Sequence, residues 1–189
     1  MSHRLAIETM WDEHLRVATT MRALAPDVDR VVDMIAKAMA AGGGLLVCGN
    51  GGSAADAQHI VAELTGRFFR DRKPLRALAL HANTSSLTAI GNDYGYDKVF
   101  AREVGAHGRE GDVLMALSTS GNSENVLQAI EAARDKGMTV IGLTGADGGK
   151  MRALCDLCLC VPSRSTPRIQ ECHILIGHTI CELLEQILC

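Results

Sequence analysis

Apolar positions recur along this chain with two different spacings, and the change between them separates two regions. In residues 3–23 they recur at helical spacing, and a second helical pattern starts at Pro26 and continues to about Ala41. After residue 43, short apolar runs bounded by turn residues predict strands instead. These runs lie near residues 44–48, 75–80, 112–118, 138–143 and 156–161.

Helical patterns occupy the intervals between the predicted strands. They lie near residues 53–66, 84–90, 96–107, 123–136 and 148–154, and a last one runs from about Pro167 to Leu188 after an N-cap at Ser165 or Thr166. Strands that alternate with helices in this way need right-handed crossover connections. The pattern therefore predicts an α/β protein whose parallel sheet is covered by helices on both faces.

Length, charge and cysteine content restrict the classes of protein to which this chain can belong. Its 189 residues suffice for one domain with a sizeable core, and no linker, repeat or low-complexity segment divides them. The net charge of −3 without a basic block argues against nucleic-acid binding, and no apolar stretch is long enough to span a membrane. Because the seven cysteines are an odd number and the N-terminus lacks a secretory apolar core, we expect reduced thiols and a cytoplasmic location.

Three of the cysteines, Cys155, Cys158 and Cys160, stand close together and allow two interpretations. A Cys-x-x-Cys pair can bind zinc, but structural zinc sites usually need a second pair. The segment also alternates ahead of Val161, as a short buried strand does. We favour the strand, because free cysteine is among the most buried residue types.

Two short segments have the composition of phosphate-binding turns. Residues 48–53 (Cys-Gly-Asn-Gly-Gly-Ser) and residues 118–123 (Ser-Thr-Ser-Gly-Asn-Ser) each follow an apolar run and precede a helical pattern. The first backbone N–H groups of a helix have no partner within it, and together with the helix dipole they attract anions. Ligands of parallel sheets bind at the carboxyl ends of the strands, where both segments are expected. The two segments therefore predict a site for a ligand with a phosphate group and a polar body.

Two further stretches carry side chains that could act chemically. His59 and Glu63 are four residues apart, so they share one face of the helix after the first turn, and Asp56 could support the imidazole from behind. Such a pair could bind a metal ion or serve as an acid and a base, although surface His–Glu pairs with this spacing are common. On the last helix, Gln170 and His178 interrupt an apolar stretch, where a histidine is as often a core residue as a functional one.

The combination of these motifs resembles the sugar isomerase (SIS) domain family, and within it the phosphoheptose isomerase branch. The resemblance covers nearly the whole chain, and its serine-rich segment 118–123 is shared by SIS domains at large. The set of His59, Glu63, Gln170 and His178 marks the isomerase branch. The other segments that carry the resemblance are residues 48–53, 56–59, 63–67, 91–93, 108–113, 143–145, 147–149 and 168–171.

The resemblance implies an α/β fold of three layers, with a five-stranded parallel sheet flanked by helices as in SIS and flavodoxin-like proteins. It implies a single SIS domain over residues 1–189, in which residues 1–42 form a helical hairpin used in oligomerisation and residues 43–189 form the sugar-phosphate-binding core. It also implies a homotetramer whose N- and C-terminal helices bundle between subunits.

The activity implied by the resemblance is the conversion of D-sedoheptulose 7-phosphate to D-glycero-D-manno-heptose 7-phosphate, the first step towards ADP-heptose for the lipopolysaccharide core. By residue-by-residue matching, His59, Glu63, Gln170 and His178 would bind one zinc ion per subunit. The residues that would contact the phosphosugar are Asn50, Gly51, Gly52, Ser53, Glu63, Asn92, Asp93, Ser118, Thr119, Ser120, Ser123 and Gln170.

The chemistry of such an isomerase assigns roles to two of these residues. One proton must move between C1 and C2 through an enediol(ate), and another between the two oxygens. Glu63 is our candidate for the carbon base and His178 for the acid/base partner on oxygen. Zinc could hold both oxygens, but a carboxylate bound to zinc is a weaker base, so Glu63 either binds the metal weakly or leaves the proton to another group.

Helix geometry adds a prediction about assembly. Gln170 and His178 are eight residues apart, which on a straight helix means about 12 Å along the axis and roughly 80° around it. We therefore expect them to reach one metal ion from different subunits, so that the active site lies at an interface. The alternatives are an isomerase of another phosphosugar and a non-catalytic SIS module that senses a phosphosugar or binds a partner protein, although such a module would not need four metal ligands.

Overall fold

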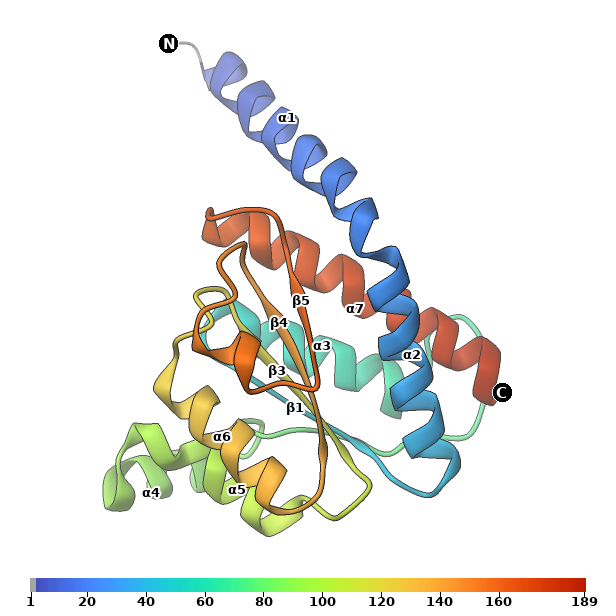
Figure 1. Cartoon of the computed structure of the whole chain (residues 1–189), viewed down its shortest axis with the longest axis vertical. Coiled ribbons are helices and arrows are strands. Elements are labelled where there is room, and N and C mark those ends of the chain that lie inside the picture. Colours follow the sequence, from blue (N-terminus) through green and yellow to red (C-terminus); the bar gives the residue numbers. More distant parts are fainter. Residues whose placement is uncertain (1–2) are drawn as a thin grey trace.

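The five apolar runs form one parallel sheet in the order β2-β1-β3-β4-β5 (Figure 1). The computed structural model describes residues 3–189. The expected five-stranded parallel sheet is therefore confirmed, and the strand order reverses between β1 and β3, where ligand sites of such sheets lie. The strands are β1 (Leu45–Gly49), β2 (Ala77–Ala79), β3 (Val113–Ser118), β4 (Thr139–Thr144) and β5 (Leu157–Cys160).

The helices agree with the predicted pattern except at some of their ends. The segment predicted as a helix over residues 148–154 contains only a short 3-10 turn, because Gly148 and Gly149 have positive φ angles that a right-handed helix excludes. Ser165 is the N-cap of the last helix, as expected, but its side chain makes no capping hydrogen bond. The helices are α1 (His3–Met21), α2 (Ala25–Ala40), α3 (Gly52–Thr65), α4 (Thr84–Tyr94), α5 (Val99–His107), α6 (Glu124–Asp135) and α7 (Thr166–Leu188), with 3-10 turns η1 (Arg22–Leu24), η2 (Tyr96–Lys98) and η3 (Lys150–Ala153).

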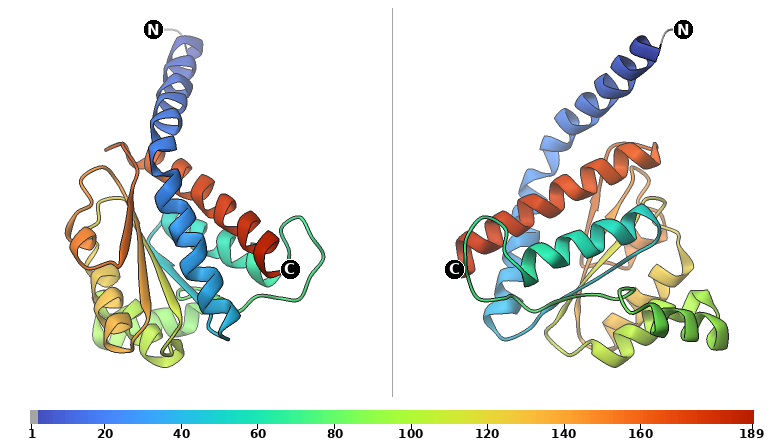
Figure 2. Two further views of the ribbon diagram at one scale, coloured as in Figure 1. Left: turned by 45° about the vertical axis from the view of Figure 1, so that its right-hand side comes forward. Right: turned by 180° about the vertical axis from the view of Figure 1, so that it is seen from behind.

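Each face of the sheet packs against its own set of helices. Helices α2, α3 and α7 cover one face with residues such as Ile35, Leu64 and Ile180, and α5 and α6 cover the other with Phe100 and Ile130 (Figure 2). Every residue of β1 and β3 is buried, which explains why both strands are unbroken apolar runs in the sequence. The buried central strands give the loops at their carboxyl ends a rigid support.

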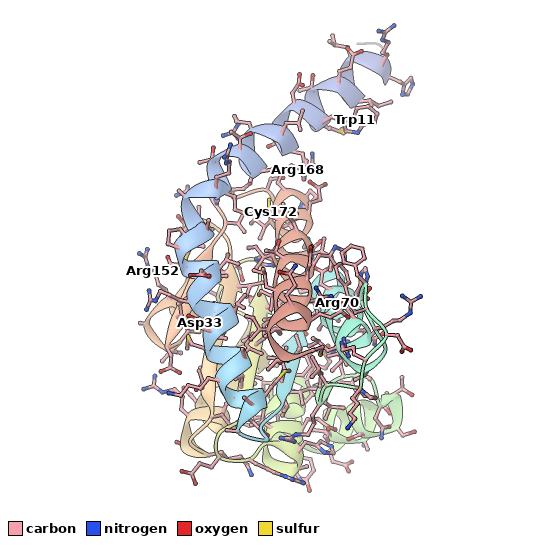
Figure 3. The ribbon with its side chains drawn as sticks, turned by 90° about the vertical axis from the view of Figure 1, so that its right-hand side faces the viewer. Trp11, Asp33, Arg70, Arg152, Arg168 and Cys172 are labelled. Atoms are coloured by element: carbon pink, nitrogen blue, oxygen red, sulfur yellow. The ribbon has the colours of Figure 1, made fainter. Side chains whose placement is uncertain are left out.

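The first helix extends away from the rest of the molecule and exposes apolar side chains. Its outer half projects beyond the sheet, with Trp11 67% exposed and Leu15 61% exposed (Figure 3). The expected helical hairpin is not formed, because the backbone stays right-handed helical through η1 and α2 continues beyond a bend instead of folding back (Figure 1). The contacts of α1 with α7 include an ion pair of 2.7 Å between His14 and Glu171.

The cysteine-rich run is a strand, as predicted. Cys158 and Cys160 lie half-buried in β5, and Cys155 precedes it. All seven cysteines are free thiols.

A search of residues 3–189 also finds no helix with both the length and the apolar character of a membrane span.

Candidate active site

The first predicted phosphate turn joins β1 to α3 and is braced by side-chain amides. Asn50 and Asn125 form a reciprocal pair, since each amide nitrogen donates a hydrogen bond to the other amide oxygen at 2.9 Å. The Tyr96 hydroxyl also donates to Asn50 Oδ1, at 3.2 Å. Gly51 has a φ of 56°, which side chains disfavour, and Ser53 is buried behind the turn. The N-terminal end of α3 is thereby held at the carboxyl edge of the sheet, where it can bind an anion.

The second predicted phosphate turn joins β3 to α6 and gathers three serine hydroxyl groups. Ser118 Oγ lies 3.0 Å from Ser123 Oγ and 3.5 Å from Ser120 Oγ. A hydroxyl group donates one hydrogen bond and can rotate to direct it, so three of them can surround a phosphate. A hollow of about 290 Å³ opens beside this turn, with Thr119 and Arg164 in its wall.

Gln170 and the end of α4 lie beside the first turn, at the carboxyl edge of the sheet. A Cβ atom on Gly52 would lie 2.6–2.7 Å from the side-chain amide of Gln170, so a glycine at this position leaves the space that the amide fills. Asn92 and Asp93 are exposed near the end of α4, where Asn92 Nδ2 donates to Asp93 Oδ1 at 2.8 Å. Tyr96 follows three residues later, and its contact with Asn50 places this segment beside the first turn.

Three of the predicted metal ligands meet farther along α3. His59 Nε2 lies 3.2 Å from Glu63 Oε1 and 3.4 Å from His178 Nε2. One ligand atom of each side chain lies within 4.8 Å of the other two, as binding of one metal ion requires. Within residues 3–189, this is the one such group of histidine, cysteine and acidic side chains. The pairing of His59 with Glu63 follows from their spacing on α3, whereas His178 is brought in by the packing of α7 on α3.

Asp56 does not make the contact with His59 that the sequence analysis expected. In residues 3–189, its carboxylate has no hydrogen bond to the imidazole, and its Oδ2 is buried without a partner. Burial raises the pKa of Asp56 to about 6, and the attraction of His59 opposes part of that rise. His59 therefore acts on Asp56 through its charge, without a direct contact.

Gln170 stands apart from the other three predicted ligands within one subunit. Its amide contacts Gly52 at the start of α3, whereas His59 lies seven residues later, about 10 Å along the helix axis. The four residues thus lie at two different heights along the axis of α3. Gln170 belongs to the level of the phosphate turns, and His178 to the level of His59 and Glu63.

Three residues at this site were not predicted from the sequence. Asn125 and Tyr96 brace Asn50, and the ring of Phe68 lies 5.6 Å from the ring of His178, between centroids. Asn125 carries a usable signal, since it is a polar residue on the buried side of the first turn of α6. Tyr96 and Phe68 belong to connecting segments, whose path does not follow from hydrophobic periodicity.

Comparisons with known proteins agree with this geometry. The SIS domain family matches residues 12–145. A phosphoheptose isomerase from Rhodospirillum rubrum is 61% identical over 165 residues, which cover 87% of this chain and 88% of that protein. The structure of phosphoheptose isomerase GmhA from Neisseria gonorrhoeae is 44% identical, with a TM-score of 0.93 and coverage of 98% and 100%.

A second solved structure extends the agreement at lower sequence identity. A phosphoheptose isomerase from Francisella tularensis is 38% identical and superposes with a TM-score of 0.96, covering 98% of this chain and all of that one. Family, sequence and fold thus lead to one assignment. The chain belongs to the SIS domain family and, within it, to the phosphoheptose isomerases.

Proposed function

We propose that this protein converts D-sedoheptulose 7-phosphate to D-glycero-D-manno-heptose 7-phosphate, the first step towards ADP-heptose for the lipopolysaccharide core. The observation that carries the proposal is the meeting of His59, Glu63 and His178 in a chain whose relatives are phosphoheptose isomerases. A carboxylate and two imidazoles at one place suit a reaction that consists of proton transfers. The free thiols of the seven cysteines support a cytoplasmic location.

The donor set of this group fits a zinc ion. Two imidazoles and one carboxylate are a common set of protein ligands for catalytic zinc. We propose that His59, Glu63 and His178 of each subunit hold one zinc ion and that Gln170 of another subunit completes the set. When bound, zinc would polarise the oxygens at C1 and C2 of the substrate.

Two side chains of the group would move the protons. Glu63 takes a proton from C1 of the ketose, which gives an enediol(ate), and its carboxyl group then delivers a proton to C2 after exchange with solvent. One oxygen of its carboxylate contacts His59, so the other can face the sugar. His178 moves the second proton from the hydroxyl at C1 to the oxygen at C2, since an imidazole can both accept and donate a proton near neutral pH.

The two turns would hold the phosphate end of the substrate. The hydroxyls of Ser118, Ser120 and Ser123 and the N-terminal end of α3 supply hydrogen-bond donors at the same edge of the sheet. Thr119, Asn92 and Asp93 would contact the sugar, as their places beside the two turns support.

We further propose a homotetramer in which each active site combines two subunits. Glu63 lies eleven residues after Gly52, about 16 Å along α3. The carbon backbone of a heptose spans no more than about 9 Å at about 1.5 Å per bond. A substrate bound at the turns of one subunit is therefore reached more easily by the His59–Glu63–His178 group of another subunit. The exposed apolar side chains of α1 support such an assembly.

An NMR experiment in D₂O tests the proposed reaction. Sedoheptulose 7-phosphate incubated with the zinc-supplied protein should give aldoheptose 7-phosphate signals with deuterium at C2. Product without deuterium would keep the isomerase but indicate a proton transfer shielded from water. No product would contradict the proposal and favour a non-catalytic SIS module.

A further inference from the structure

The segment between α3 and β2 is held by an ion pair that is almost completely buried. The side chains of Arg72 and Glu185 are 3% and 2% exposed, and Arg72 Nε donates to Glu185 Oε1 at 3.1 Å. Glu185 also accepts hydrogen bonds from the backbone N–H groups of Phe68, Phe69 and Arg70, at 2.8–3.1 Å. Burial raises the pKa of Glu185, but these donors and Arg72 outweigh it, so the pKa lies below its ordinary value.

Arg72 connects this carboxylate to the end of α3. Its Nη2 donates to the backbone carbonyl of Glu63 and its Nη1 to that of Leu64, each at 2.7 Å. Glu185 lies seven residues after His178, two turns along the same face of α7. The ion pair therefore links the turn of α3 that carries Glu63 to the face of α7 that carries His178.

The same contacts hold an aromatic ring against His178. The N–H of Phe68 is fixed by Glu185, and the Phe68 ring lies 5.6 Å from the His178 ring at an angle of 35°. The orientation of His178 is thus limited by His59 on one side and by Phe68 on the other.

We propose that Arg72 and Glu185 are positioning residues, which set the separation of His59 and Glu63 from His178 and thereby the affinity of this group for a metal ion. The inference rests on the proposed function, because it concerns the group that would hold the metal. A buried ion pair is weak evidence for a role in stability, since well-packed apolar residues often serve as well. The seven hydrogen bonds that these two side chains make to the backbone of the neighbouring segments are better explained by orientation of the ligands.

The protein contains a matched control at the amino ends of the strands, the edge of the sheet opposite the phosphate turns. Asp112 is 1% exposed, accepts the N–H groups of Gly44 and Arg109 at 2.9 and 3.0 Å, and pairs with Arg76. It is therefore a second buried carboxylate that binds backbone N–H groups and an arginine. It precedes β3, whereas the phosphate turns follow the strands.

The test compares Glu185→Gln and Arg72→Lys with Asp112→Asn in the full-length protein, using Co²⁺ as the probe. We expect both site variants to weaken Co²⁺ binding about 10- to 100-fold and to change its visible absorption spectrum, as loss of residues that orient metal ligands does. They should lower kcat for sedoheptulose 7-phosphate and leave KM unchanged, because the phosphate turns are intact. Asp112→Asn should lose thermal stability but keep the Co²⁺ affinity and spectrum of the wild type.

Three results would overturn the inference. They are a wild type that binds no Co²⁺, site variants with wild-type affinity and spectrum, and an Asp112→Asn variant that loses as much affinity as the site variants. If Glu185→Gln does not fold, Arg72→Lys decides, since lysine keeps the charge beside Glu185 but cannot reach both carbonyls of α3. Co²⁺ binding does not depend on turnover. A shifted affinity in a protein without isomerase activity would thus support the inference and contradict the proposed function alone.

Discussion

At the scale of single residues, two histidines of α7 show how surroundings decide the role of a side chain. His173 is fully buried, and its Nε2 lies 3.3 Å from the carbonyl oxygen of Thr144. Burial lowers the pKa of His173 to about 4, so the imidazole stays neutral inside the core. His178, five residues later, is partly exposed and faces His59, where a ligand can reach it.

His173 should make the stability of the protein depend on pH. The unfolded chain takes up a proton at this residue below pH 6.5, but the folded chain does so only near pH 4. The free energy of unfolding should therefore fall as the pH falls through this window, by about 2 kcal/mol at pH 5. The free energy of unfolding is measured with urea on metal-free protein at pH 7.5 and 5. It should decrease by about 2 kcal/mol less in His173→Gln than in the wild type, whereas the exposed control His3→Gln should show the full decrease. Equal decreases in wild type and His173→Gln would contradict the expectation.

Glu63 tests whether the proposed base is also a metal ligand. Glu63→Gln keeps a hydrogen-bond acceptor beside His59 but removes the basic oxygen, so kcat should fall about 10²- to 10⁴-fold. Zinc content is measured on the same sample. If the Glu63→Gln protein keeps its zinc but loses activity, Glu63 is the base. If it loses both zinc and activity, Glu63 is a metal ligand. The exposed Glu182→Gln should change neither quantity, and a Glu63→Gln protein with wild-type kcat would rule out both roles.

The residues of the site differed in how far they could be predicted. His59 and Glu63 follow from local spacing, because residues four apart on a helix are neighbours. His178 lies 119 residues from His59, so only the resemblance to a family linked the two before the packing of α7 was known. Arg72 and Glu185 gave no signal, since a buried ion pair between a loop and a helix has no sequence period.

At the scale of elements, the turns at the carboxyl edge depend on close backbone approach. Gly121 has a φ of 65°, and a Cβ at this position would collide with the carbonyl oxygen of Gly148. Gly111 also has a positive φ, of 82°, but a Cβ there would meet no atom within 4 Å. The two glycines therefore separate the cost of backbone strain from the cost of a collision beside the serine-rich turn.

Alanine at these two positions should have different effects. Gly111→Ala should cost about 1–2 kcal/mol of stability through its positive φ and leave KM for the sugar phosphate unchanged. Gly121→Ala should cost more and also raise KM, because the turn that carries Ser120 and Ser123 must shift. Thermal unfolding and steady-state kinetics measure both effects. A Gly121→Ala variant with normal KM would show that this turn does not bind the phosphate.

The helices and strands could be predicted from the sequence where the spacing of apolar residues followed a single pattern. Buried strands β1, β3 and β4 were found within about one residue of their ends, because each is centred on buried apolar residues and bounded by turn residues. Strand β2 was predicted over residues 75–80 but covers only Ala77–Ala79, since its pairing with β1 is limited to three positions. The helical hairpin over residues 1–42 was expected from the resemblance alone, and the positions of the two helices along the chain do not fix the angle between them.

At the scale of the whole molecule, several large apolar side chains of α1 are exposed instead of being packed into the core. Trp11, Leu15 and Met10 project on α1, and a hollow of about 350 Å³ lies between Met21, Val28 and residues of α7. Exposed apolar side chains gathered on one helix are typical of an interaction site. Together with the separation of Gln170 from His178, this exposed surface favours active sites shared between subunits.

Subunit mixing tests the shared site. Gln170→Ala and His178→Ala should each be nearly inactive, because each removes one proposed metal ligand from every site. When the two variants are co-expressed in equal amounts, about a quarter of the sites should combine an intact Gln170 from one chain with an intact His178 from another. Activity should rise accordingly above both parents. No recovery in a mixture shown to contain both chains would place the two residues in one subunit.

The short outer strands have a consequence for the behaviour of the protein at high concentration. Strand β2 has three residues and β5 has four, and these are the two edges of the sheet. An edge strand can recruit a strand of another molecule and extend into a fibril, but only when its row of unpaired backbone groups is long enough. These edges are too short for that, whereas the exposed apolar side chains of α1 offer a surface for contacts between helices. Chains that associate in the homotetramer proposed above would form a closed assembly of defined size, without an open-ended row of strands.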